Sequence, residues 1–234
     1  MTMRLHAAFA TLALVVTSAA NAAEPVRRVD IYVAPYYAAA ATADGAPEVH
    51  VGASFSGLLA ATGRDDIIAA RDKLAAAPSL VTPMTMMVLA IRLYDMGLRD
   101  DAVFWFYAAK DRAITLIDVI DIDAAGFGGV QDAVGAFVTL AGPVINGYAF
   151  CDVANQQAIR AKALDWLVAN PYGAIMLERI PAKPGDRAVN LARSLAGIRA
   201  GAAKESAYLA DANNLAKLAA SRAKNKMDEM FCWK

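Results

Sequence analysis

Residues 82–117 read TPMTMMVLAIRLYDMGLRDDAVFWFYAAKDRAITLI, and this stretch decides the fold. Its Thr-Pro start, an N-cap followed by proline in the first turn, predicts a helix over Met84–Met96. Gly97 ends that helix, and helical spacing begins again over Asp100–Ile117. Two helices joined by so short a link must fold back on each other as an antiparallel pair.

The segments on either side of this pair also have helical spacing. Helices are predicted over Arg64–Ala76 and Asn155–Ala169. Gln131–Leu140 and Val144–Phe150 read as two buried helical pieces, because the Gly-Pro pair between them should interrupt a helix. The last helical region carries an apolar stripe at three- and four-residue steps, made of Tyr208, Ala212, Leu215, Ala219, Ala223, Met227 and Met230.

The segment before residue 52 is predicted to be extended. Val26–Tyr37 is rich in β-branched and aromatic residues, and residues 48–51 alternate again after an Asp-Gly turn. Alanine, the strongest helix former, is the most frequent residue of the chain as a whole. The sequence therefore predicts a mainly α fold, a single-domain helical bundle with a short N-terminal β-hairpin.

Residues 1–22 have the pattern of a secretory signal peptide. Arg4 precedes an apolar run over Ala7–Val16, and Ala20-Asn21-Ala22 is an A-x-A cleavage site. The run is too short for the about 20 residues that span a bilayer, so no stable membrane anchor is expected after cleavage. The alternative is a buried amino-terminal helix. We expect a periplasmic or secreted protein whose residues 23–234 form the helical domain.

Cys151 and Cys232 are the two cysteines of the chain. An oxidising compartment favours a disulfide between them, which on a chain-entropy model would stabilise the fold by about 4 to 5 kcal/mol. The alternative is two separate buried thiols. The pair lacks the spacing of a metal site.

One segment resembles a known repeat. Small and aromatic residues recur where a tetratricopeptide repeat hairpin places them: Leu93, Gly97, Ala102, Phe106 and Ala109. The run Ala102-x-x-Trp105-Phe106 followed by Ala109-Lys110 is similar to the second helix of a Sel1-type repeat. The resemblance covers residues 83–113, and it implies a protein-binding surface rather than an active site.

The charge balance and the histidine content narrow the function. Lys+Arg and Asp+Glu both number 23, so the chain has no long-range attraction for nucleic acid. His50 is the single histidine after residue 22, and no Gly-x-Ser-x-Gly elbow is present. These observations predict a protein that is not an enzyme and has no cofactor.

The densest carboxylate group is an alternative ligand site. Asp118, Asp121 and Asp123 precede a glycine-rich turn, and oxygen-rich loops can hold calcium. Their spacing does not match an EF-hand, and a helix end with a solvated loop also explains them.

The aromatic run Phe104-Trp105-Phe106-Tyr107 covers most of a helix circumference. A helix that is apolar all round is usually the buried centre of a bundle. The functional alternative is a groove wall in which Trp105 and Tyr107 contact a partner, because such rings are frequent at binding hot spots. Of the four, Tyr107 is expected to lie nearest a surface.

Together these features predict an exported, non-catalytic protein-binding module, such as a periplasmic immunity or inhibitor protein or an envelope accessory protein. Its expected partner is a protein. The alternative is a small-ligand or calcium-binding protein, or an enzyme that uses carboxylates alone.

Overall fold

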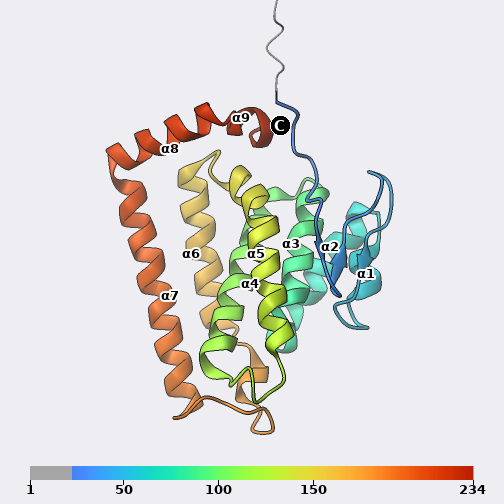
Figure 1. Cartoon of the computed structure of the whole chain (residues 1–234), viewed down its shortest axis with the longest axis vertical. Helices are drawn as coiled ribbons and strands as arrows, with labels where there is room; N and C mark the ends of the chain where they lie inside the picture. The colour runs from blue at the N-terminus through green and yellow to red at the C-terminus, as the bar shows by residue number, and fades with distance from the viewer. Residues whose placement is uncertain (1–22, 234) are drawn as a thin grey trace, which may run out of the picture.

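The computed structural model describes residues 23–233, so the predicted signal peptide lies outside the described residues. The structure is 66% helical, which confirms the mainly α fold. Central α4 (Arg99–Val119) is surrounded by α3 (Pro83–Asp95), α5 (Gly128–Ala149), α6 (Val153–Ala169) and α7 (Arg187–Ala210) (Figure 1). The other elements are β1 (Tyr32–Val33), β2 (Tyr37–Ala38), β3 (Glu48–Val49), α1 (Ser56–Ala60), α2 (Arg64–Ala76), η1 (Pro78–Leu80), η2 (Gly173–Met176), α8 (Ala212–Lys224) and α9 (Met227–Phe231).

The predicted α3–α4 pair forms the centre of the core. Thr82 caps α3, its Oγ1 accepting a hydrogen bond from the Thr85 backbone N–H at 3.2 Å. Gly97 takes a φ of +75°, a left-handed conformation that suits glycine, and the Leu98 N–H then bonds back to Leu93 O at 2.8 Å. Every residue of α3 before Asp95 is buried, so this helix has no solvent face.

α5 is continuous, and the predicted break at its Gly-Pro pair is wrong. Pro143 lies inside the helix without ending it. Proline removes the bond to the carbonyl four residues earlier, but Thr139 and Pro143 are both exposed, so water can solvate that carbonyl.

Within residues 23–233, α5 is the one helix long and apolar enough to cross a membrane, by length and composition. A core helix of a globular protein has the same two properties. Phe137 and Ile145 of α5 are fully buried against the rest of the bundle.

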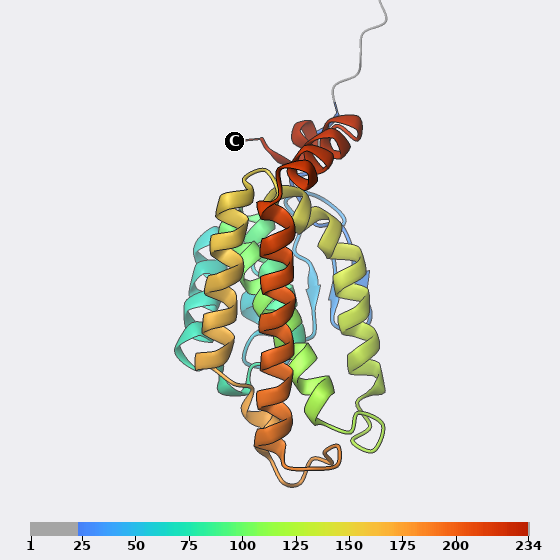
Figure 2. The ribbon, with the colours of Figure 1, turned by 90° about the vertical axis from the view of Figure 1, so that its left-hand side faces the viewer.

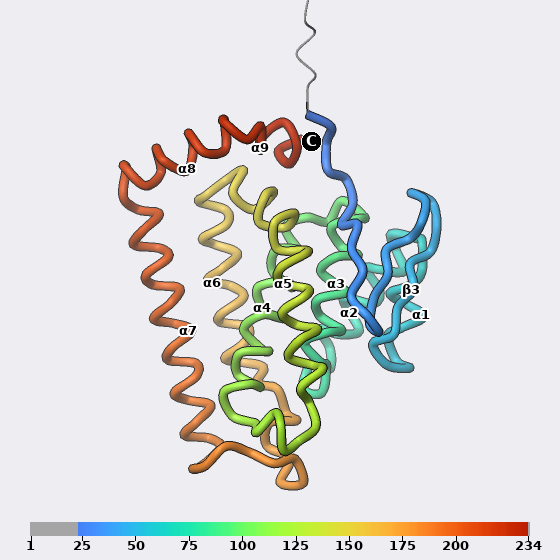
Figure 3. Tube along the Cα trace, in the orientation of Figure 1, coloured from blue at the N-terminus to red at the C-terminus, as the bar shows by residue number. Residues whose placement is uncertain are grey.

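The amino-terminal segment forms a small antiparallel sheet in the order β1-β2-β3, with Val33 opposite Tyr37 and Tyr37 opposite Val49. The single strand predicted over Val26–Tyr37 is therefore two strands. The chain turns between them at Pro35, which cannot donate a ladder hydrogen bond in mid-sheet. Figure 3 shows the sheet and α1 on the side of α3 away from α7.

The carboxyl-terminal helices do not bury the predicted apolar stripe. Asp211 ends α7 and caps α8, its side chain accepting from the Asn214 N–H, so the chain changes direction there (Figure 1). Tyr208 is 55% exposed, and α8 buries only Arg222. The two ends of the described chain meet above the bundle, where Val26 N–H donates to Met230 O at 2.8 Å.

A buried ion pair joins the amino-terminal segment to the end of α3. Arg92 Nη1 lies 3.0 Å from Asp95 Oδ2, and the two side chains are only 5% and 6% exposed. Asp95 Oδ1 accepts from the Val29 backbone N–H at 2.8 Å, while Arg92 donates to Leu59 O and Ala61 O. Burial raises the pKa of Asp95 to about 6, although the Val29 N–H and Arg92 oppose the shift.

This pKa predicts a pH-dependent stability. The folded-state value lies above the unfolded value of about 3.9, so the proton on Asp95 favours the folded state. Its contribution is fully present below about pH 4 and is lost as pH rises through about 6, a change of about 3 kcal/mol in the free energy of unfolding. Urea unfolding of the wild type and of Asp95→Asn from pH 3.5 to 7.5 measures this change. The contributions of the other carboxylates cancel when the free energies of unfolding of the two proteins are subtracted. A difference that is constant with pH would contradict the prediction.

Candidate functional site

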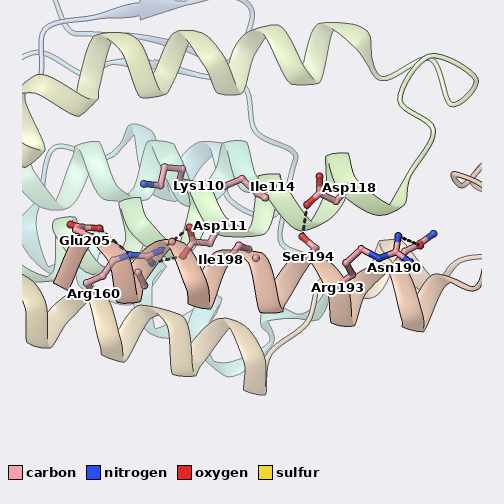
Figure 4. A pocket seen from close by; sticks show the side chains of 13 residues that line it. Lys110, Asp111, Ile114, Asp118, Arg160, Asn190, Arg193, Ser194, Ile198 and Glu205 are labelled. Atoms are coloured by element: carbon pink, nitrogen blue, oxygen red, sulfur yellow. Dashed lines mark hydrogen bonds and ion pairs between the residues drawn. The ribbon is translucent and has the colours of Figure 1, made fainter. Parts of the chain in front are cut away.

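A groove of about 540 Å³ is lined by residues of α7, α4 and α6. These three helices lie side by side (Figure 2), and Figure 4 shows the side chains that line the groove. Its lining on α7 extends from Asn190 to Glu205, fifteen residues further along the helix. At about 1.5 Å per residue, the groove is about 22 Å long. The charged lining residues are Lys110, Asp111 and Asp118 on α4, Arg160 on α6, and Arg193 and Glu205 on α7.

α7 is fixed at its start and packs lightly along the rest of its length. Asp186 caps it by accepting from the Val189 N–H at 2.9 Å, and Arg187 donates to Ile175 O at 2.7 Å. Its 24 residues bury only five side chains, those of Asn190, Leu191, Ser194, Ile198 and Leu209. A helix with so few buried side chains leaves open space beside its neighbours.

A buried ion pair forms the wall of the groove between α4 and α6. Both terminal nitrogens of Arg160 donate to the carboxylate of Asp111, whose side chain is 1% exposed. Burial raises the pKa of Asp111, and Arg160 opposes that shift. Arg160 Nε is buried without a hydrogen-bond partner, and Glu205 Oε2 lies 3.9 Å from it. This wall therefore carries an unused donor.

A chain of polar side chains continues from this pair into the core. Gln156 Nε2 donates to Glu205 Oε1 at 2.9 Å and lies 3.1 Å from the Tyr107 hydroxyl. That hydroxyl donates to Asn146 Oδ1 at 3.0 Å, and burial raises the pKa of Tyr107 to about 12. The network fixes the side chain of Glu205 at the end of the groove.

The aromatic run belongs to the core. Trp105 and Tyr107 are 3% and 4% exposed, so neither ring is available to a partner. Trp105 packs edge-on against Trp166, with 5.1 Å between the ring centroids. The expectation that Tyr107 lies nearest a surface is wrong, because its hydroxyl is satisfied inside the bundle; Phe104 is the half-buried member of the run.

Two exposed glycines of α7 line the groove. Gly197 and Gly201 line it, and a Cβ added at either would meet no atom within 4 Å. Glycine inside a helix is less stable than alanine by about 1 kcal/mol. Close packing does not explain these two residues, since the space beside them is empty.

The three aspartates proposed as a ligand loop do not converge. Asp118 lies on α4 and accepts from Ser194 Oγ at 2.7 Å across the groove (Figure 4). Asp121 accepts from the Ala124 N–H at 3.0 Å, and Asp123 is exposed. Over residues 23–233, no three His, Cys, Asp or Glu side chains gather in a group that could hold a metal ion.

The groove was not predicted from the sequence, although the residue pattern of α6 indicates a buried polar network beside it. Gln156, Arg160, Ala163 and Leu167 share the buried face of this helix. Polar residues at four-residue spacing on an otherwise apolar face indicate a buried network.

The predicted disulfide is confirmed and ties the chain end to the bundle. Cys151, which follows α5, is bonded to Cys232, which follows α9. Buried Arg222 lies against both sulfurs, at 3.4 and 3.1 Å, and also donates to Gly147 O. A Cβ at Gly147 would clash with the Phe231 ring at 2.7 Å, so glycine allows α9 to lie this close to α5.

An uncharacterized protein of Haemophilus influenzae is 34% identical over 225 residues, which cover 96% of this chain and 87% of that protein. The chain belongs to the family of that protein. No family model and no solved structure matches the chain. The likeness of residues 83–113 to tetratricopeptide and Sel1-type repeats therefore rests on their own residue pattern.

Proposed function

We propose that this protein is an exported, non-catalytic binding module whose α4–α6–α7 groove holds a short extended segment of a partner protein. The observation that carries the proposal is the open space beside Gly197 and Gly201. Two glycines within one helix lower its stability and gain no packing in return. A bound partner that needs the space accounts for both of them.

The size of the groove suits an extended peptide. An extended chain advances about 3.3 Å per residue, so a groove about 22 Å long accommodates about six or seven residues. Ile114 and Ile198 line its middle, between charged groups at both ends. An apolar centre with polar ends is typical of peptide-binding surfaces, in which side chains give specificity.

The charges of the groove are arranged for binding rather than for reaction. Its lining holds three basic and three acidic side chains, so it is close to neutral. Each acidic side chain has a partner inside the fold: Asp111 has Arg160, Asp118 has Ser194 and Glu205 has Gln156. A carboxylate held in this way orients peptide N–H groups better than it abstracts protons.

Two features support a location outside the cytoplasm. The signal-like residues 1–22 predict export, and disulfides persist in oxidising compartments. A periplasmic immunity or inhibitor protein, or an envelope accessory protein, would need such a partner-binding groove without a reactive group.

Filling the groove should abolish binding without destabilising the fold. Gly201→Leu places an apolar side chain in the open space, and leucine is a better helix former than glycine by about 0.8 kcal/mol. A phage-displayed library of random seven-residue peptides is selected on immobilised residues 23–234. Fluorescence polarisation then measures the dissociation constants of the selected peptides. We expect Gly201→Leu to weaken them at least tenfold while its free energy of unfolding stays at or above that of the wild type.

The matched control is Gly135→Leu. Gly135 also lies within a helix, α5, and also has no atom within 4 Å of an added Cβ, but it is outside the groove. This variant should bind like the wild type. Failure to select any peptide, or equal binding by Gly201→Leu and the wild type, would overturn the proposed function.

A further inference from the structure

A second hollow begins where the groove ends. Glu205 lines both the groove and a pocket of about 340 Å³ under α8. This pocket lies between the last turns of α7, the start of the loop after α5, and α8. The two hollows therefore adjoin each other along α7, with Glu205 in the lining of both.

The second pocket is mostly apolar. Phe150, Tyr208, Leu209 and Leu218 line it, with Lys217 and Ser221 on α8 completing the lining. Tyr208 is 55% exposed and Leu209 is buried. A large exposed aromatic side chain beside an apolar hollow is typical of a binding hot spot.

The roof of this pocket is held in place without a ligand. α8 buries little of its own surface, yet its end is tied down by Arg222, which contacts Gly147 O and Asp228. The disulfide then fixes the chain to the loop after α5. A pocket formed in advance lowers the ordering cost of binding.

We propose that this pocket, defined by Phe150, Tyr208, Leu209 and Leu218, takes one apolar side chain at the end of the segment bound in the groove. The ligand class is therefore an extended peptide with a terminal apolar residue followed by about six residues along the groove. This inference rests on the proposed function of the groove.

Size and polarity select this occupant. A pocket of about 340 Å³ is at the small end of ligand sites, so it suits a single large side chain rather than a whole helix. The Glu205 side chain is 37% exposed, and its carboxylate can accept a backbone N–H of the residue next to the apolar one. The apolar side chain in the pocket and the backbone hydrogen bond to Glu205 together fix the register of the peptide.

Peptides selected from the seven-residue library test the inference. We expect them to share a Leu, Met, Phe or Trp at one terminal position. Tyr208→Ala should weaken their binding by about ten- to thirtyfold, as loss of a hot-spot aromatic does. Val189→Ala is the matched control, because Val189 is 56% exposed on the same helix and lines neither hollow. It should leave binding unchanged.

A second measurement separates this inference from the proposed function and from misfolding. Replacing the terminal apolar residue of the peptide with serine should weaken binding to the wild type equally, with no further loss on Tyr208→Ala. If neither change affects binding while Gly201→Leu still abolishes it, the anchor pocket is wrong and the groove function stands. If Gly201→Leu also has no effect, the proposed function fails.

Discussion

Replacing Cys151 and Cys232 together with serine should lower the free energy of unfolding by about 4 to 5 kcal/mol. The bridge closes a loop of 81 residues, and the loss of that constraint gives the unfolded chain more conformations. The loop contains α6 and α7, which supply most of the lining of the groove, and also α8. Urea unfolding of the double variant against the wild type, both without reductant, measures the change.

The loss of stability on removal of the disulfide should be distributed unevenly over the fold. α8 and α9 contact the bundle chiefly through Arg222 and Phe231, so they should open first. Hydrogen exchange should then show faster exchange in α8 and α9 and unchanged protection in α3. Dithiothreitol added to the wild type is the control, since it removes the same bond without a substitution. A loss below about 1 kcal/mol would contradict the prediction, because the remaining contacts would then hold the chain end.

Asp111→Asn should lower the free energy of unfolding by about 3 to 5 kcal/mol. The change removes the hydrogen-bonded counter-charge of the buried Arg160 guanidinium and leaves it only the Glu205 carboxylate at 3.9 Å, and a poorly paired buried charge is far less stable than a well-paired one. Arg160→Met should have a comparable effect, because it strands the carboxylate of Asp111. Denaturant unfolding at pH 7 measures both variants.

The double variant Asp111→Leu/Arg160→Met tests whether a buried charge without a close partner causes the loss of stability. Because it removes both charges and replaces them with apolar side chains of similar size, its stability should return to within about 1 kcal/mol of the wild type. Its affinity for the selected peptides should still fall, since the wall of the groove has lost its polar groups. A double variant that stays at least 3 kcal/mol less stable than the wild type would contradict this explanation.

The helices could be predicted because their signals are local. Thr82 and Gly97 mark the ends of α3, and both act through the backbone of their own turn. The prediction failed at Pro143, where exposure of the preceding turn decides whether proline breaks a helix. It also failed for the apolar stripe from Tyr208 onward, because the cap at Asp211 redirects the chain.

The groove could not be predicted because it is assembled from three helices. Neighbouring members of the set Asp111, Arg160 and Glu205 are 45 residues or more apart in the sequence, and they meet only after α4, α6 and α7 have packed. An aromatic run has the same pattern in a core and in a binding surface, so the sequence favoured the core for Trp105 and Tyr107 and left a groove wall as the alternative. Packing placed both in the core.

The meeting of the chain ends has a practical consequence. Val26 and Met230 are hydrogen-bonded at the pole of the bundle that carries the disulfide, while the start of α7 lies at the opposite pole (Figure 1). A fusion protein or surface tether attached at residue 23 or at residue 233 would thus emerge from a single site. Immobilised this way, the molecule would present its distal half to solution without obstruction from the attachment.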